Sequence, residues 1–192
     1  MAPTLTDVNL WRISRHDDLD GLGGERADGR WHTAAKGKRI VYLSEHPALA
    51  LIEVLANLKG NPRLFPDAYR LMKISVHPKV WSATQQIDPP QNDPGTGTNP
   101  GAPHLASEMW VSKTPAPLPP DWRDDRTLTR TVGDAWLTAR TSALLRVPSA
   151  PAPESFNYLL NPHHPDAQTL ITDWTKWLTY DKRLFHLHDN PR

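Results

Sequence analysis

Apolar residues alternate along some stretches of this chain and recur at helical spacing along others. The clearest alternation runs from Tyr69 to Val76, where Met72, Ile74 and Val76 fall on one side of an extended chain. Shorter runs rich in β-branched and aromatic residues predict further strands at 9–14, 39–43, 143–147 and 157–160. Helical spacing predicts helices at 47–59 and 129–141. Strands interleaved with single helices indicate an α/β or α+β domain rather than a bundle or a sandwich.

The helix predicted at 47–59 has a broad apolar face, so we expect it to be largely buried. Ser44 is its expected N-cap, Glu45 places an acid in the first turn, and Gly60 is the expected stop. Glu53 lies at the edge of the apolar face. A carboxylate there is costly unless it is paired, hydrogen-bonded or beside a cleft. A snorkelling or salt-bridged glutamate at the helix margin is the simpler alternative.

Proline-rich stretches separate the predicted elements. Residues 85–103 offer almost nothing to bury and predict an exposed, mobile loop, and residues 114–120 predict an extended connector. Between residues 170 and 187, aromatic and leucine side chains recur at spacings that pack onto a core. The length fits one domain and no repeat is visible, so we expect residues 1–192 to form a single domain.

Composition narrows the function classes. Lys plus Arg total 22 against 21 Asp plus Glu, so no overall field points to nucleic acid or to an anionic membrane. The chain has no cysteine, which excludes disulfides and thiolate chemistry and suits a reducing cytosol. No apolar run reaches membrane-spanning length, and the N-terminus lacks a signal-peptide core. We therefore expect a cytoplasmic protein with no membrane association.

Candidate chemistry is sparse when each motif is taken alone. In Gly29-Arg30-Trp31 the glycine permits close backbone approach and the arginine offers a planar fork for phosphate or carboxylate. An arginine stacked on a surface tryptophan is the commoner outcome of such a motif. The histidines in 161–165 and 186–188 lack further ligands at a zinc spacing, so we expect no metal. Phosphate-loop, dinucleotide-binding and nucleophile-elbow motifs are absent from the sequence.

Several short motifs nevertheless occur in a fixed order over almost the whole chain. They are 11–12 (WR), 29–31 (GRW), 41–44 (VYLS), 48–54 (ALALIEV), 133–137 (GDAWL), 145–149 (LRVPS), 157–162 (NYLLNP) and 180–185 (YDKRLF). No single motif is decisive. The ordered set resembles the RES-domain toxins of bacterial toxin–antitoxin pairs.

The resemblance implies a fold like that of ADP-ribosyltransferases, a cleft that binds NAD as substrate, and cleavage of the nicotinamide–ribose bond by hydrolysis or phosphorolysis. Matched motif by motif, Arg30 is the family arginine, Glu53 the glutamate and Ser149 the serine, and these are the expected catalytic residues. Tyr42 matches the site tyrosine, and Arg12 is a candidate for a second phosphate contact. A carboxylate near the ribose would stabilise developing positive charge, and no metal is needed.

Two positions leave choices open. Ser142 is an alternative to Ser149 as the family serine, and Ser149 is preferred because it lies in the Val-Pro-Ser motif. His32 stands where many members have asparagine, which leaves the acceptor open among water, phosphate and protein. The loop at 88–103 also looks longer than the family minimum, and its role is open between a lid, a partner-binding loop and a neutral insertion.

The resemblance also implies a partner, namely a cognate antitoxin with a helix-turn-helix, Xre-like DNA-binding domain that blocks the cleft. A homodimer within a larger toxin–antitoxin complex is a further option. Two alternatives to NAD depletion stay open: a mono-ADP-ribosyltransferase modifying a specific protein, and a non-catalytic or RNA-binding module using the basic residues between 12 and 39. Acidic residues in 17–28 offset that basic cluster, so we expect no direct nucleic-acid binding.

Overall fold

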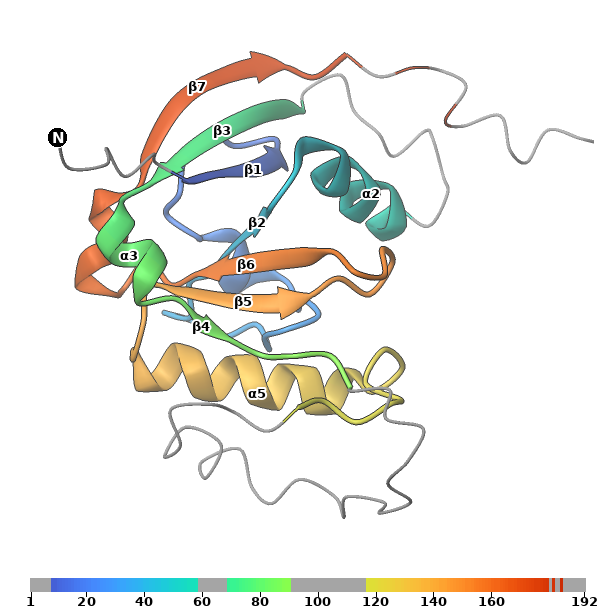
Figure 1. Ribbon diagram of the computed structural model, residues 1–192. Helices are drawn as coiled ribbons and strands as arrows, with labels where there is room; N and C mark the ends of the chain where they lie inside the picture. Colours follow the sequence, from blue (N-terminus) through green and yellow to red (C-terminus); the bar gives the residue numbers. More distant parts are fainter. Residues whose placement is uncertain (1–7, 59–68, 91–116, 180, 182–183, 185–192) are drawn as a thin grey trace, which may run out of the picture.

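The computed structural model describes residues 8–58, 69–90, 117–179, 181 and 184, which build a seven-stranded sheet with helices packed against it (Figure 1). In chain order the elements are β1 (Val8–Ser14), α1 (Gly23–Arg26), β2 (Val41–Ser44), α2 (Pro47–Asn57), β3 (Arg70–Val76), α3 (Pro78–Ser82), β4 (Gln85–Gln86), α5 (Arg126–Ala139), β5 (Leu144–Pro148), β6 (Phe156–Leu160), the 3-10 helix η2 (Pro165–Thr169) and β7 (Ile171–Trp177). None of the described helices is long and apolar enough to cross a bilayer.

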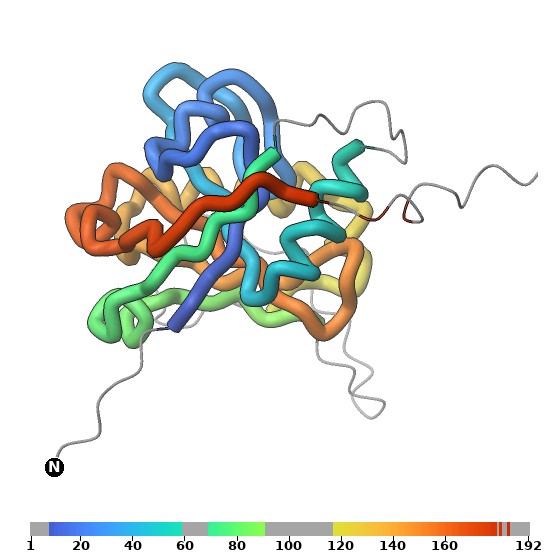
Figure 2. The backbone as a smooth tube through the Cα atoms, turned by 90° about the horizontal axis from the view of Figure 1, so that it is seen from above, coloured from blue at the N-terminus to red at the C-terminus, as the bar shows by residue number. Residues whose placement is uncertain are grey.

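The strand order in the sheet is β4-β5-β6-β2-β1-β3-β7. The short β4 pairs with β5 in parallel, and the other neighbouring strands are antiparallel. Strands from the two ends of the chain therefore meet at the centre of the sheet, where β2 lies between β6 and β1. Figure 2 shows β7 and β3 side by side. In the strand order β7 is one edge of the sheet and β4 is the other. The mixed α+β fold predicted from the sequence is confirmed.

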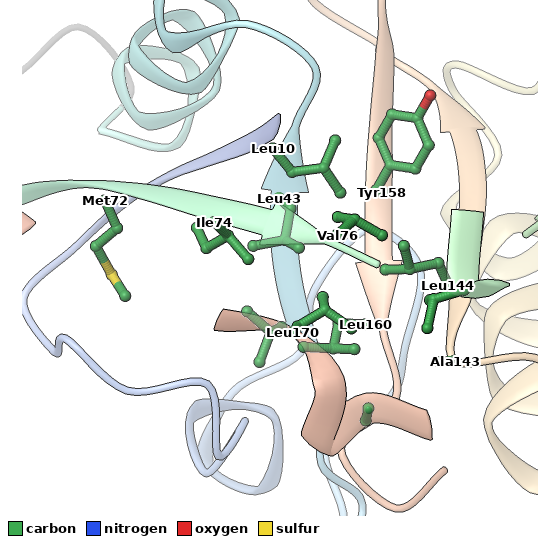
Figure 3. Close-up of a cluster of buried hydrophobic side chains, with 13 residues drawn as sticks. Leu10, Leu43, Met72, Ile74, Val76, Ala143, Leu144, Tyr158, Leu160 and Leu170 are labelled. Carbon is green, nitrogen blue, oxygen red and sulfur yellow. The ribbon is translucent and has the colours of Figure 1, made fainter. Parts of the chain in front are cut away.

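Both faces of the sheet centre are buried. One face carries a cluster that includes Leu10, Leu43, Met72, Ile74 and Leu160 (Figure 3). The opposite face carries a second cluster, in which side chains of β5 and β6 pack against α5 and two tryptophans: Leu145, Val147, Leu159, Val132, Trp136, Trp31 and Trp122. Successive strand residues point to opposite faces, so Leu159 and Leu160 enter different clusters.

The alternating pattern predicted β3 well. Met72, Ile74 and Val76 are fully buried, as expected for one face of a strand. The strands predicted at 9–14, 39–43, 143–147 and 157–160 correspond to β1, β2, β5 and β6 within two residues at each end. The helix predicted at 129–141 is present as α5, which begins earlier because the Asp125 side chain accepts a hydrogen bond from the Leu128 amide at 2.8 Å and caps it.

The prediction for α2 was wrong in two respects. Its N-cap is His46, whose side chain accepts from the Ala48 amide at 3.2 Å, whereas Ser44 is the last residue of β2. The helix is also only partly buried, since its buried residues are Leu49 and Ala50 and Ile52 is 41% exposed. The helix contacts β1 and β2, and its other apolar residues are partly buried or exposed. Gly60 lies outside the described residues.

Two loop predictions also need correction. The stretch predicted as an exposed loop from residue 85 begins as β4, and Ile87 next to it is fully buried. The connector predicted at 114–120 contains Leu118, which is buried and donates its amide to the Asp88 carbonyl at 3.1 Å. Apolar side chains at these two ends complete the cluster under α5. Residues 91–116 lie outside the described residues.

The aromatic tail packs onto the core only in part. Its described portion forms the edge strand β7, in which Trp174 meets Trp11 edge to face at 5.6 Å between ring centroids. Ile171 and Trp177 are 63% and 64% exposed, because an edge strand has a neighbour on one side only. Residues 185–187 lie outside the described residues.

Candidate active-site cleft

A cavity of about 780 Å³ opens on the sheet face that α2 and α5 share. Six parts of the chain line it: the end of β1, residues 23–32, residues 40 and 42 at β2, residues 53–57 of α2, residues 123–126 at the start of α5, and residues 150–151 after β5. Its charged and polar lining includes Arg12, Asp28, Arg30, His32, Tyr42, Glu53, Asn57, Arg123, Asp124 and Arg126. A smaller cavity of about 130 Å³ shares Arg12, Tyr42 and Glu53 with it.

Glu53 is held by two neutral donors on one of its oxygens. The Ser149 hydroxyl donates to Oε1 at 2.7 Å, and the Asn157 amide Nδ2 donates to the same atom at 2.5 Å. Ser149 directly follows β5 and is 1% exposed, and its own Oγ accepts from the Ala152 amide at 3.2 Å. Among the described residues Glu53 makes no salt bridge, and its Oε1 accepts these two hydrogen bonds instead.

Tyr42 lies at the centre of a hydrogen-bonded chain in the cleft wall. Its hydroxyl accepts from the Trp31 amide at 3.1 Å and lies 2.9 Å from Nδ1 of His32. The other ring nitrogen of His32, Nε2, lies 3.2 Å from the Gly24 carbonyl, so Nε2 carries the proton and Nδ1 accepts from Tyr42. Burial raises the pKa of Tyr42 and lowers the pKa of His32, which keeps both side chains neutral.

Glycine at position 29 is required by this chain of contacts. A Cβ built on Gly29 would collide with the Tyr42 hydroxyl and with the His32 ring. The backbone of the loop can therefore pass directly over both side chains. This close passage brings Arg30, the next residue, to the cleft.

Arg30 both stacks on a tryptophan and lines the cleft, which are the two outcomes that its motif allowed. Its guanidinium carbon lies 5.9 Å from the centroid of the Trp122 ring, and its Nη1 donates to the Arg123 carbonyl at 2.9 Å. It also lines the cleft. Burial, followed by the nearby charge of Arg126, lowers the pKa of Arg30, while Glu53 opposes that shift. A guanidinium remains charged under such conditions, so the side chain presents a partly desolvated cation to the cavity.

Arg12 provides a second cation in the cleft. Its Nη1 donates to the Asp18 carbonyl at 2.5 Å, which fixes the side chain against the acidic loop that follows β1. Burial is the main cause that lowers the pKa of Arg12, and Asp18 and Asp20 act against it. The cleft thus combines the carboxylate of Glu53 with the cations of Arg12 and Arg30, and Asp28, Asp124, Arg123 and Arg126 also line it.

The structure brings together four of the predicted residues and places the fifth behind them. Arg12, Arg30, Tyr42 and Glu53 line the cavity, and Ser149 contacts it through Glu53. Ser142 lies elsewhere. Its hydroxyl accepts from Nε1 of Trp136 at 3.0 Å and donates to the Leu144 carbonyl at 2.8 Å. The geometry therefore favours Ser149 over Ser142 as the serine of this site.

Residues 9–181 match the family model described as the RES domain. This chain belongs to the RES domain family. The protein named Toxin Res from Pseudomonas putida is 37% identical over 179 residues, which cover 92% of this chain and 99% of that protein. The Prs ADP-ribosylating toxin of a Sphingobium species is 30% identical over 186 residues, which cover 92% of this chain and 96% of that protein. The resemblance drawn from the ordered motifs is confirmed.

A solved structure shares the fold of this RES domain. It is a chain of the M. tuberculosis MbcT-MbcA toxin-antitoxin complex, with a TM-score of 0.62, 20% sequence identity, and coverage of 91% of this chain and 85% of that chain. At this identity the likeness concerns the fold alone. The mixed sheet with its flanking helices is therefore an architecture that this RES domain shares with a solved structure.

Sequence reasoning missed several residues of the RES-domain cleft. Asn157 was seen only as part of a strand, although an asparagine in an otherwise apolar run, FNYLL, is a signal of a polar partner. Arg123 and Arg126 lie among aspartates in the sequence, and no motif singles them out. Both line the cleft, and Arg123 also lies 5.0 Å over the Trp122 ring.

The remaining candidates have structural roles. His163 Nε2 lies 3.1 Å from the Gly37 carbonyl, and His164 Nδ1 accepts from the Asp166 amide at 3.1 Å to cap η2. Within the described ranges, no three His, Asp or Glu side chains converge as metal ligands would. Residues 186–188 lie outside those ranges. Two cations of the basic cluster pair with acids: Lys38 with Asp134 at 2.9 Å and Arg39 with Glu25 at 3.1 Å.

Proposed function

We propose that this RES domain is the toxin of a bacterial toxin–antitoxin pair and depletes cytoplasmic NAD by cleaving the nicotinamide–ribose bond. Family membership and relatives that are named as toxins support this role. The observation that carries the chemistry is Glu53, a carboxylate that is fixed by two neutral donors and lines the same cleft as Arg12 and Arg30.

In the proposed reaction the bond between the nicotinamide nitrogen and the ribose anomeric carbon breaks. The electron pair leaves with nicotinamide, which becomes neutral, and positive charge develops on the ribose. An acceptor oxygen, from water or from inorganic phosphate, then bonds to the anomeric carbon and any proton it carries is released to solvent. Glu53 stabilises the developing charge or holds a ribose hydroxyl, and it needs to remain ionised for either task.

The other residues bind and orient the substrate in this proposal. Arg30 and Arg12 neutralise the pyrophosphate, for which the guanidinium fork is well matched. The Tyr42 ring provides a flat surface for nicotinamide, while its hydroxyl is already occupied by Trp31 and His32 and takes no part in proton transfer. Ser149 keeps the Glu53 carboxylate in place. No step requires a metal.

The test is release of nicotinamide from NAD by the purified protein. Wild type is expected to release it, while Glu53→Gln and Arg30→Ala are expected to lose most of the activity at unchanged melting temperature. Arg39→Ala is a matched control, because Arg39 pairs with Glu25 and does not line the cleft. Intact NAD with wild type under water, phosphate and protein acceptor conditions would contradict the proposal. Turnover by folded Glu53→Gln would contradict the role of the carboxylate.

The second candidate function is ADP-ribosylation of a specific protein by the same residues. It is favoured by the relative named Prs ADP-ribosylating toxin, which is 30% identical and covers 92% of this chain. The two functions differ in the acceptor only. NAD labelled in its adenosine part separates them, since the label stays on a protein after transfer but remains on a small molecule after depletion.

We further propose a cognate antitoxin with an Xre-like helix-turn-helix domain that blocks the cleft. The solved structure with the same fold comes from a toxin-antitoxin complex. Co-expression of the adjacent gene product is expected to restore growth, and its complex with this chain is expected to leave NAD intact. Light scattering of that complex would also establish whether two copies of the RES domain are present. An active complex would contradict the blocking role.

An RNA-binding module is the least supported alternative. Lys38 and Arg39 are already paired with acids, which reduces the cationic surface available to phosphates. Binding to RNA, if real, would weaken steeply with salt because phosphate contacts release counterions. Absent or salt-insensitive binding would remove this alternative.

A further inference from the structure

The fixed position of Glu53 depends on contacts that reach back into the sheet. Asn157 on β6 stands opposite Ser44 on β2 in the strand register. The Ser44 hydroxyl donates to Oδ1 of Asn157 at 2.8 Å, and Nδ2 of Asn157 donates to Oε1 of Glu53 at 2.5 Å. Ser44 and Asn157 are both buried. A chain of two hydrogen bonds thus connects the centre of the sheet to the carboxylate on α2.

The orientation of the Asn157 amide is set by its two neighbours. If the amide were flipped, its oxygen would face the Glu53 carboxylate, and two acceptors would lie in contact without a proton between them. The Ser44 hydroxyl supplies the donor that Oδ1 needs in the observed orientation. Asn157 therefore presents an N–H that Oε1 of Glu53 accepts.

The two oxygens of Glu53 have different surroundings. Oε1 accepts from both Ser149 and Asn157. Oε2 has no hydrogen-bond partner among the described residues, although Glu53 lines both cavities of the cleft. One oxygen is thus used to fix the side chain, and the other is left for a ligand.

We infer that Asn157, supported by Ser44, is the positioning residue that holds the catalytic carboxylate Glu53 with Oε2 directed at the substrate. Ser149 fixes the same oxygen from the β5 side, so the carboxylate is held from two strands. This role rests on the proposed NAD cleavage. Its distinctive consequence is that an N–H or O–H donor at position 157 is needed for turnover, while a second carboxylate there is harmful once it ionises.

The first measurement separates positioning from binding. Asn157→Ala removes the donor at Glu53 Oε1, and kcat for NAD cleavage is expected to fall roughly 10- to 100-fold, because a small displacement of a reacting group is costly. The KM for NAD is expected to change by less than about threefold, since the arginines that bind the pyrophosphate remain. Ser44→Ala leaves the amide in place without its anchor, and a smaller fall in kcat is expected.

The second measurement uses Asn157→Asp, which has nearly the same shape. Protonated aspartic acid donates to Glu53 as asparagine does, whereas two ionised carboxylates at this separation repel each other. The activity of Asn157→Asp is therefore expected to fall as the pH rises from about 5 to about 8, while wild type shows no such loss. Wild type and Asn157→Asp share every other charged or titratable group that lines the cleft with Glu53. These groups are Arg12 on β1, Tyr42 on β2, Asp28, Arg30 and His32 before β2, and Arg123, Asp124 and Arg126 before and at the start of α5.

Asn9→Asp is the matched control. Asn9 is a strand asparagine whose Oδ1 accepts from Ser75 at 3.5 Å, and it does not line either cavity of the cleft. Its pH profile is expected to follow wild type. Wild type without NAD turnover would overturn the proposed function and this role with it. An active wild type with unchanged kcat in Asn157→Ala, or, where that variant does not fold, a wild-type pH profile in Asn157→Asp, would overturn the role of Asn157 alone.

Discussion

The Ser149 hydroxyl lies 2.7 Å from Oε1 of Glu53, although 96 positions separate the two residues in the sequence. Ser149 directly follows β5, and Glu53 is on α2. Their contact therefore depends on the packing of α2 against the sheet. The sequence left open whether Ser149 or Ser142 is the serine of the site. The contact favours Ser149, since Ser142 contacts Trp136 instead. Each serine has a different expected effect when its hydroxyl is removed.

Ser149→Ala is expected to lower kcat for NAD cleavage with little change in stability at the site. A hydrogen bond to a charged group is worth about 1.5–3 kcal/mol, so the loss corresponds to roughly 10- to 100-fold in rate if it is felt in the transition state. Steady-state kinetics on NAD, with thermal melting as the folding control, provide the measurement. Unchanged kcat in a folded Ser149→Ala protein would show that this hydroxyl has no role in turnover.

Ser142→Ala is expected to lower the stability of the fold and to leave kcat unchanged. The substitution leaves the indole N–H of the fully buried Trp136 without its 3.0 Å acceptor, which costs about 1–3 kcal/mol of folding free energy. Urea unfolding is expected to show this loss of stability. The kcat of the protein that remains folded should match wild type, and a selective loss of kcat here would reverse the assignment of the two serines.

Local patterns allowed the sequence to predict β3 and α5, because burial of Met72, Ile74 and Val76 follows directly from alternation. The N-cap of α2 was wrong because Ser44 is used by a distant residue: its hydroxyl donates to Asn157, so β2 continues through it and His46 caps the helix. Nothing in the local sequence reveals that contact, which arises only from the pairing of β2 with β6.

The site residues also divide into those that the sequence revealed and those that depend on contacts between distant parts of the chain. The resemblance to RES domains singled out Arg30, Tyr42, Glu53 and Ser149 by motif, without any geometry, and the structure brings them together at one cleft. Asn157 needed the strand register, in which it stands opposite Ser44. Arg123 and Arg126 needed the path of the chain before α5, in which Arg123 lies over the Trp122 ring and its carbonyl accepts from Arg30.

His32 is expected to make stability depend on pH in the acidic range. Burial lowers the pKa of His32 below its usual 6.5, so the unfolded chain binds a proton in a range where the folded protein does not. The stabilising contribution is fully present above pH 6.5 and is lost as the pH falls below it toward the folded pKa. The melting temperature of wild type is therefore expected to fall more steeply below pH 6.5 than that of His32→Asn.

An exposed histidine provides the control for this prediction. His163→Asn removes a side chain on the surface near Gly37, so the pH dependence of melting should stay as in wild type. Parallel melting curves for wild type and His32→Asn at every pH would show that His32 is not held neutral by the fold.

Gly133→Ala is expected to destabilise the protein, although alanine is normally favoured over glycine inside a helix by about 1 kcal/mol. A Cβ at this position of α5 would overlap the carbonyl oxygen of Trp31, which belongs to the backbone and cannot rotate away. Relief requires α5 or the Arg30–Trp31 loop to shift, at a cost of about 1–3 kcal/mol or more. Because that loop carries Arg30 to the cleft, the KM for NAD is expected to rise as well.

Gly23→Ala is the matched control for stability, since nothing lies within 4 Å of a Cβ there. Urea unfolding of both variants and NAD kinetics of Gly133→Ala against wild type make the comparison, and equal stability of the two variants would show that α5 is not in rigid contact with the loop.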